Sequence, residues 1–79
     1  MSWRVVVIES QSKLDYKMGY LVVRGLETKR VLLDEIAVLL IENPAVSMTG
    51  VLIAALTEKK IKVIFCDAKR NPIAELVPH

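Results

Sequence analysis

The sequence is poor in the residues that cross-link a fold or bind transition metals. Its 79 residues contain one cysteine, Cys66, and one histidine, His79. A single cysteine cannot form an internal disulfide, and no Cys/His cluster has the spacing of a zinc site. A lone thiol fits a reducing compartment, so we expect a cytoplasmic protein.

Long apolar runs and a strong charge imbalance are missing as well. The longest apolar stretches, residues 36–41 (IAVLLI) and 51–56 (VLIAAL), are far shorter than the roughly 18 to 20 residues that span a bilayer. The aliphatic run at residues 5–8 is too short for the core of a signal peptide. Eleven Lys and Arg stand against nine Asp and Glu, and a net charge of +2 attracts phosphate only weakly. We therefore expect no membrane partner, and net charge alone does not predict nucleic-acid binding.

The chain has more apolar residues than a domain of its length can readily bury. Apolar residues make up 53% of the sequence, and the mean hydropathy is +0.41. A domain of this length buries only about 60–65% of the surface that its unfolded chain exposes. The excess predicts a partner surface, or a further part of the chain, that covers it.

The order of patterns predicts an α+β domain that is mainly β. A continuous β-branched run at residues 4–9 suits a strand covered on both faces, and residues 12–25 alternate around a turn at Met18-Gly19. Ser47 is the predicted N-cap of one buried helix that ends at about Lys60. The other predicted strands are Arg30–Leu33, Val38–Ile41, residues 62–67 and residues 73–77. We expect one small sandwich-like domain, residues 1–79, with six to seven short strands.

Cys66 and Asp67 raise the question of an active site, because a thiol and a carboxylate end an apolar run just before two cations. A nucleophilic thiol needs a nearby base and a lowered pKa, and no suitable histidine is in the sequence neighbourhood. The simpler interpretation is a buried thiol at a strand end, with Asp67 accepting backbone N–H bonds in the turn. Four acids could suggest a metal site, but they lie at predicted strand ends and turns where solvation explains them: Glu9, Asp34, Glu35 and Glu42. We predict no catalytic and no metal-binding residue in this chain.

Cations near the predicted hairpin are a better functional candidate. Cations interleaved with an aromatic ring can contact phosphates while the ring stacks on an unpaired base. The candidate DNA contacts are Lys13, Tyr16, Lys17, Arg24, Lys29 and Arg30. The alternative is that these cations are merely solvated or protect a strand edge. A second basic cluster, residues 59–62, is explained by the negative end of the helix dipole.

Apolar runs on two strands predict self-association. One small core cannot bury all the apolar side chains of residues 4–8 (RVVVI), residues 37–41 (AVLLI) and a helix that is apolar on more than one side. We expect a symmetric dimer with an apolar centre. The candidate interface residues are Trp3, Val6, Ile8, Leu39 and Ile41.

Three stretches in this order resemble one known family: SKLDYKMGYLVV, VLLDEIAVLLIEN and VSMTGVLIAALTEKKIKVIFCDAKRNPIAELVP. Together they resemble the N-terminal domain of the CRISPR-associated integrase, the metal-dependent DNA endonuclease that inserts new spacers, in its type II form. The resemblance implies a β-rich N-terminal dimerisation domain. It also implies that the catalytic metal site, with Mg or Mn bound by two acids and a histidine, belongs to a helical C-terminal domain absent from these 79 residues.

The resemblance further implies a homodimer, a small CRISPR adaptation partner subunit, and double-stranded DNA in the full complex. No cofactor is expected in this chain, and the chain alone is expected to be inactive. One alternative is a self-contained β-rich protein-interaction module unrelated to nucleic acid. A third hypothesis is a small enzyme that uses Cys66.

Overall fold

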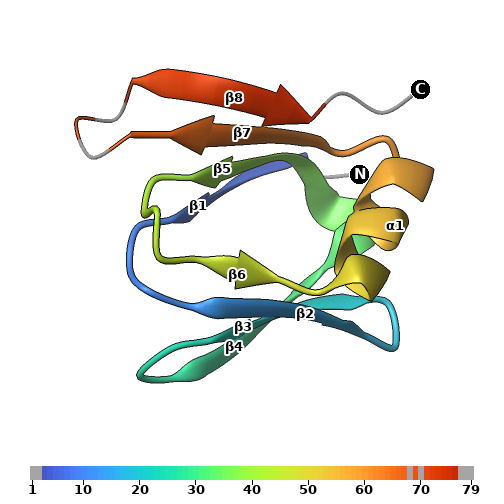
Figure 1. The fold of residues 1–79 in the computed structure, drawn as a ribbon. Coiled ribbons are helices and arrows are strands. Elements are labelled where there is room, and N and C mark those ends of the chain that lie inside the picture. The colour runs from blue at the N-terminus through green and yellow to red at the C-terminus, as the bar shows by residue number, and fades with distance from the viewer. Residues whose placement is uncertain (1–2, 68, 70, 77–79) are drawn as a thin grey trace.

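The described residues form two four-stranded sheets and one helix (Figure 1). The computed structural model describes residues 3–67, 69 and 71–76. The first sheet has the order β1-β5-β7-β8, formed by Arg4–Ile8, Ile36–Ile41, Lys62–Cys66 and Pro72–Leu76. The second sheet has the order β4-β3-β2-β6, formed by Thr28–Leu32, Tyr20–Arg24, Lys13–Lys17 and Ser47–Met48. A 3-10 turn, η1 (Leu33–Glu35), and a helix, α1 (Gly50–Glu58), complete this part of the chain, which confirms the mainly β α+β class.

The β2–β3 hairpin forms where the sequence predicts it. Met18 and Gly19 both have positive φ, at 52° and 87°, which is the backbone of a type I′ turn. The turn places Lys17 opposite Tyr20 and continues the register to Lys13 opposite Arg24. A two-residue loop of this type sets the register of the whole hairpin, and so decides which side chains share a face.

The start of the helix differs from the prediction. Ser47 and Met48 form β6, because they pair in parallel with Lys13 and Leu14 of β2. The N-cap is Thr49, whose side-chain oxygen accepts a hydrogen bond of 3.2 Å from the backbone N–H of Leu52. The Thr49 hydroxyl also donates to Asp15 Oδ1 at 3.2 Å, which ties the helix start to β2. A strand bridge to a distant segment thus delays the helix by two residues.

Thr49→Ala is therefore expected to lower the free energy of unfolding by about 0.5–2 kcal/mol, as for other N-cap truncations. The matched control is Ser47→Ala, which removes an exposed hydroxyl and is expected to change stability by less than about 0.5 kcal/mol. Urea unfolding of both variants measures the difference. A larger loss for Ser47→Ala than for Thr49→Ala would restore Ser47 as the cap.

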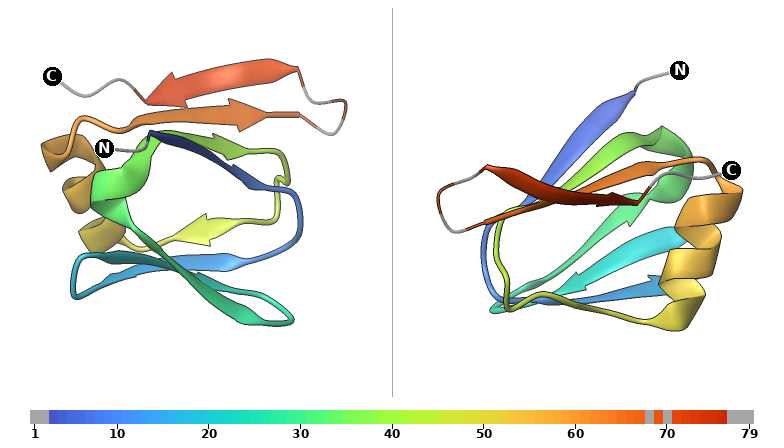
Figure 2. Two further views of the ribbon diagram at one scale, coloured as in Figure 1. Left: turned by 180° about the vertical axis from the view of Figure 1, so that it is seen from behind. Right: turned by 45° about the horizontal axis from the view of Figure 1, so that its top comes forward.

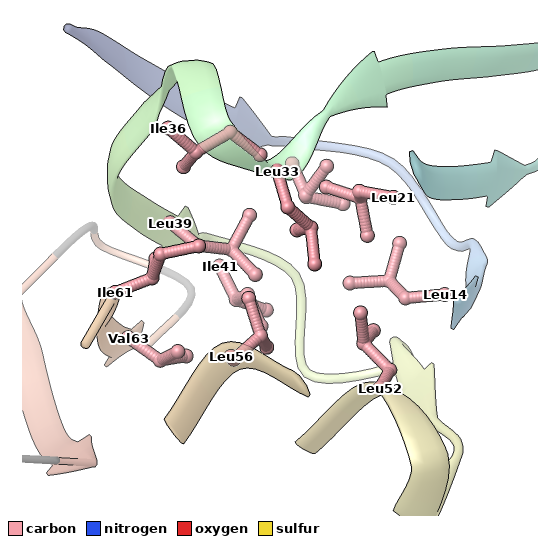
Figure 3. Close-up of a cluster of buried hydrophobic side chains, with 11 residues drawn as sticks. Leu14, Leu21, Leu33, Ile36, Leu39, Ile41, Leu52, Leu56, Ile61 and Val63 are labelled. Carbon is pink, nitrogen blue, oxygen red and sulfur yellow. The ribbon is translucent and has the colours of Figure 1, made fainter. Parts of the chain in front are cut away.

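The core lies between the two sheets, and α1 closes it on one side (Figures 1 and 2). Leu52 and Leu56 of α1 are fully buried and point at the facing strands (Figure 3). They meet side chains from both sheets and from η1: Leu14, Leu21, Leu33, Ile36, Leu39, Ile41, Ile61 and Val63. Because strands alternate, each sheet sends every second side chain into this layer.

The outer face of the first sheet is apolar and uncovered by the rest of the described chain. Val5 of β1 is 62% exposed and Val7 is 42% exposed, so the expectation that this strand is covered on both faces is wrong. The pairing of β1 with β5 and of β5 with β7 extends the same face across the sheet. We call the outer apolar face the set Val5, Val7, Val38, Leu40 and Ile64.

The predicted interface residues divide between core and surface. Ile8, Leu39 and Ile41 are at most 5% exposed and belong to the core, so their side chains are not on a surface that a partner can contact. Val6 is half-buried and packs against the core. Trp3 is 68% exposed. The alternation of β1 and β5 explains the division, because Val6 and Leu39 pair on the inner face while Val7 and Leu40 pair on the outer face.

Candidate nucleic-acid interface

The outer face of the second sheet gathers most of the cations predicted to contact DNA. Strand pairing arranges this face in three rows across β2, β3 and β4. The rows are Lys13–Arg24–Thr28, Asp15–Val22–Arg30 and Lys17–Tyr20–Leu32. We call these nine residues the basic face. It carries four cations and one carboxylate, a local imbalance that the whole-chain net charge of +2 conceals.

Two of the six candidates lie on the other side of the sheet. Tyr16 pairs with the buried Leu21 and packs against the core, and Lys29 pairs with Val23, which also contacts the core. Lys29 lines an open cleft of about 930 Å³ together with Val6, Val23 and Val31, and the cleft also reaches Lys13 and Arg24 at the end of the basic face. Tyr16 therefore does not share a face with Lys13 and Lys17, contrary to the prediction, because side chains of adjacent strand residues point to opposite faces.

Tyr20 is the aromatic residue that the basic face presents, and the sequence analysis missed it. Its side chain is 40% exposed, and it lies directly opposite Lys17. The signal was present in the sequence. Once Met18-Gly19 is taken as a two-residue turn, Tyr20 must pair with Lys17 and share its face.

Val22 is the buried centre of the basic face. It is only 3% exposed although it lies on the outer face of the sheet, between Asp15 of β2 and Arg30 of β4. Arginine and lysine commonly lay their aliphatic stems over apolar surface while the charged ends stay in water. Val22 is thus an apolar position in the middle row of the basic face, next to Arg30.

Asp15 is the carboxylate of the basic face, and its charge offsets one of the four cations. Its Oδ1 accepts a hydrogen bond of 2.8 Å from the Tyr16 backbone N–H and the bond from Thr49. These hydrogen bonds, with the nearby Arg24 and Lys13, lower the pKa of Asp15 from its ordinary value, against a smaller opposing effect of desolvation. Asp15 therefore stays ionised at neutral pH, and its carboxylate serves the β2–α1 junction.

Among the described residues, the ion pairs involve other cations than those of the basic face. The pairs found there join Arg4 to Glu35 at 3.6 Å, Lys59 to Asp34 at 2.6 Å, and Lys62 to Glu75 at 3.0 Å. The hydrogen bond to Asp34 and its charge raise the pKa of Lys59. Lys59 and Lys62 of the second basic cluster are thus engaged with acids. Lys13, Lys17, Arg24 and Arg30 form no ion pair among the described residues, although Lys13 and Arg24 lie near the Asp15 carboxylate.

The acidic residues do not assemble a metal site in the part of the chain that the structure describes. No three His, Cys, Asp or Glu side chains come together there. Asp34 and Glu35 are engaged with Lys59 and Arg4, and His79 lies outside the described residues. These residues do not fit the Mg or Mn ion that the resemblance implies for the full-length family.

Cys66 and Asp67 are explained by packing and by a turn. The Cys66 side chain is 5% exposed at the end of β7, and burial is the main cause that raises the pKa of its thiol. Asp67 Oδ1 accepts backbone N–H bonds of 2.9 Å from both Lys69 and Asn71. The thiol is thus kept protonated and enclosed, which is the opposite of what a nucleophile requires.

Cys66→Ser is expected to lower the free energy of unfolding by about 1–3 kcal/mol if the hydroxyl finds no partner at this apolar site. Native Cys66 is also expected to react slowly with a soluble alkylating reagent, and quickly once urea unfolds the chain. Mass spectrometry of the alkylated protein measures both rates. Equal rates in the folded and unfolded chain would show that the thiol is accessible.

Comparison with known sequences identifies a related protein. No protein-family model matches the chain. The "CRISPR-associated endonuclease Cas1" of Neisseria meningitidis serogroup C is 31% identical to it over 80 aligned residues, which cover 100% of this chain and 26% of that protein. This chain is a homologue of Cas1. The homology confirms the family resemblance inferred from the sequence, whereas the type II form stays a prediction.

Solved structures agree with the homology at the level of the fold. The Cas1 homologue superposes on a chain of the partial Cas6-RT-Cas1–Cas2 complex with a TM-score of 0.88, at 15% identity over 99% of this chain and 24% of the other. It superposes on the TtCas1–DNA complex with a TM-score of 0.83, at 13% identity over 96% of this chain and 29% of the other. The chain spans about a quarter of the length of these proteins. No helix among its described residues is long and apolar enough to cross a membrane.

Proposed function

We propose that this Cas1 homologue is the N-terminal domain of a type II CRISPR adaptation integrase, a metal-dependent DNA endonuclease that captures and inserts foreign DNA spacers. In this proposal the domain itself is non-catalytic and contributes DNA contacts and homodimer contacts. The observation that carries it is the 31% identity to Cas1 along the whole chain. The catalytic metal, Mg or Mn, would be bound outside these residues, and the assembled protein would work in the cytoplasm.

The basic face supplies the DNA contacts in this proposal. Its four cations can neutralise phosphates, and each neutralised phosphate releases bound counterions when DNA binds. The names of two structural neighbours, a Cas1–DNA complex and a Cas1–Cas2 complex, support DNA and a small adaptation subunit as partners, and in this proposal the DNA is double-stranded. We assign the phosphate contacts to Lys13, Lys17, Arg24 and Arg30.

Fluorescence anisotropy with labelled duplex DNA at several salt concentrations tests this function. Wild-type affinity should fall steeply with salt, and Arg24→Gln and Arg30→Gln should each reduce the salt slope by about one. Lys60→Gln, which removes an exposed cation at the end of α1, is the matched control and should leave the slope unchanged. Binding that responds equally to all three substitutions would contradict the assignment of the basic face.

The outer apolar face supplies the homodimer contacts. A stable pair buries about 1,200–2,000 Å² in total around an apolar centre. Val5, Val7 and Leu40 offer such a centre, and the Lys62–Glu75 ion pair borders the same face on β7 and β8. The same face would also serve a self-contained interaction module, the alternative function. The mass of the native gene product separates the two, because a product of about this length favours the module.

With Mg²⁺ or Mn²⁺ this chain alone is expected neither to cut nor to join DNA. The physical reason is that metal-assisted phosphoryl transfer needs carboxylates converging on the ions, and the described residues hold no such group. Gel analysis of labelled duplex and forked substrates measures the outcome against a no-protein control. Metal-dependent cleavage that Glu9→Gln or Asp67→Asn abolishes would overturn the prediction.

A further inference from the structure

The helix α1 is apolar on the side that faces away from the core as well as on the side that is buried. Leu52 and Leu56 are buried, whereas Val51 is 63% exposed and Ile53 is 38% exposed. Residues 50–57 include no charged side chain, and Glu58 is the only charged residue of the helix. A surface helix normally carries polar or charged residues on its outer side, and a helix that is apolar all round is normally covered all round. The composition of α1 therefore indicates a second partner.

The outer side of α1 forms one continuous surface. Residues three and four positions apart share a side of a helix, which places Gly50, Ala54 and Thr57 in a row between Val51 and Ile53. We call these five residues the outer helix face. The Thr57 hydroxyl donates a hydrogen bond of 2.9 Å to the Ile53 carbonyl oxygen, so its proton is already used within the helix. A Cβ atom added at Gly50 would meet nothing within 4 Å, so the described chain leaves that point open.

The last residue of β8 lies beside the C-terminal end of this helix. Leu76 pairs with Val63 of β7, and only residues 59–62 separate Val63 from Glu58 at the end of α1. In each view of Figures 1 and 2, β8 ends on the side of the domain where α1 lies. The nine residues of α1 span about 14 Å, which about four to five residues of extended chain can cover. Chain that follows Leu76 can therefore reach any part of the outer helix face through a short connection.

A helix is the element best suited to cover this face. It satisfies its own backbone hydrogen bonds, so it can lie on an apolar surface without leaving N–H and C=O groups unpaired. A lone extended strand would leave such groups unpaired against Val51 and Ile53, which offer no partner for them. Side chains of two helices also interlock as ridges and grooves, and small residues such as Gly50 and Ala54 let the two axes come close.

We propose that a helix of the chain beyond residue 79 packs against the outer helix face. This rests on the proposed function, in which these residues are the N-terminal domain of a longer protein, as the 26% coverage of the Cas1 relative supports. It adds to that function the place where the rest of the protein docks. The contact is held by apolar burial, because the outer helix face carries no charge. It is separate from the outer apolar face, which lies on the first sheet and serves the second copy.

Alkylation of a thiol placed on the outer helix face tests the docking. Ala54→Cys adds a small side chain at an exposed position, and Leu26→Cys, at a fully exposed position between β3 and β4, is the matched control. Each is made in the 79-residue chain and in the full-length gene product. The Ala54→Cys thiol should react at least about tenfold more slowly in the full-length product, which corresponds to about 1.4 kcal/mol of docking free energy. The Leu26→Cys thiol should react equally fast in both.

The outcomes separate the docking from the proposed function. If the gene product extends well beyond residue 79 and the Ala54→Cys thiol reacts equally fast in both lengths, the docking is wrong and the proposed function stands. If the gene product ends at residue 79, both fail. If the thiol of the 79-residue chain reacts slowly at high protein concentration and quickly after dilution, a second copy covers the face, and docking of the following chain is wrong.

Hydroxyl-radical footprinting gives a second readout that needs no substitution. Radicals oxidise exposed aliphatic and sulfur-containing side chains, and mass spectrometry of the peptides measures the extent. We expect Val51 and Ile53 to be oxidised in the wild-type 79-residue chain and protected in the full-length product. Met18, which is 86% exposed, should be oxidised in both. Equal oxidation of α1 in the two lengths would overturn the proposal, even if the Ala54→Cys variant does not fold.

Discussion

Val7→Lys is expected to convert a dimer of this chain at micromolar concentration into a monomer. The side chain points outward from the edge strand β1 next to Leu40, so the lysine would place a charge on the exposed part of the outer apolar face. Losses at well-packed interface positions reach about 2–4 kcal/mol, a weakening of roughly 30- to 1,000-fold. Sedimentation equilibrium of wild type and variant measures the shift. Salt should matter little to the wild-type dimer, because burial of apolar surface drives it.

Val51→Lys is the matched control for this experiment. Val51 is 63% exposed on α1, away from the first sheet, so the same charge there should leave self-association unchanged. Val6 is a poor site for the test, because it faces inward and a lysine there would perturb the core as well. A monomeric mass for well-folded wild type at about 100 μM, well above the dissociation constants of specific dimers, would overturn the prediction.

Leu56→Ala is expected to lower the free energy of unfolding by about 2–5 kcal/mol. Leu56 has no exposed surface and lies where α1 meets both sheets, so its removal leaves a cavity that rigid neighbours cannot fill (Figure 3). A 79-residue domain has a total stability of only roughly 4–12 kcal/mol, so this single change can unfold a large fraction of the molecules at 37 °C.

Urea unfolding monitored by circular dichroism measures this loss. The control is Val51→Ala on the exposed side of the same helix, which should change stability by less than about 0.5 kcal/mol. A loss below about 1 kcal/mol for Leu56→Ala would mean that the core relaxes into the space, contrary to the close packing expected of it.

Local patterns in the sequence predicted several features correctly. The hairpin at Met18-Gly19, the β-rich α+β class and the single helix all follow from signals that act over a few residues, and each is confirmed. The family was also within reach of the sequence, since three ordered stretches indicated it and the identity to Cas1 confirms it. Cys66 at the end of a strand was equally predictable from the apolar run before it.

The errors came from contacts between distant segments. Ser47 was predicted as the N-cap because a serine before an apolar run is a local signal, but its pairing with Lys13, 34 residues earlier, places it in β6. In the same way, β1 was predicted to be covered on both faces from its composition alone. Which faces of a strand are covered depends on the sheets and helices packed against it, and no local pattern records that.

The sequence by itself determined which residues are candidates for DNA contact and where the turns place them along the chain. Only the tertiary structure decided that Lys13, Lys17, Arg24 and Arg30 share a face with Tyr20, while Tyr16 and Lys29 lie on the other side of the sheet. It also decided that Ile8, Leu39 and Ile41 are core and that Val5 and Val7 are surface. The physical reason is the two-residue period of β-strands: a shift of one position moves a side chain to the opposite face, and strand pairing across the whole domain sets that position.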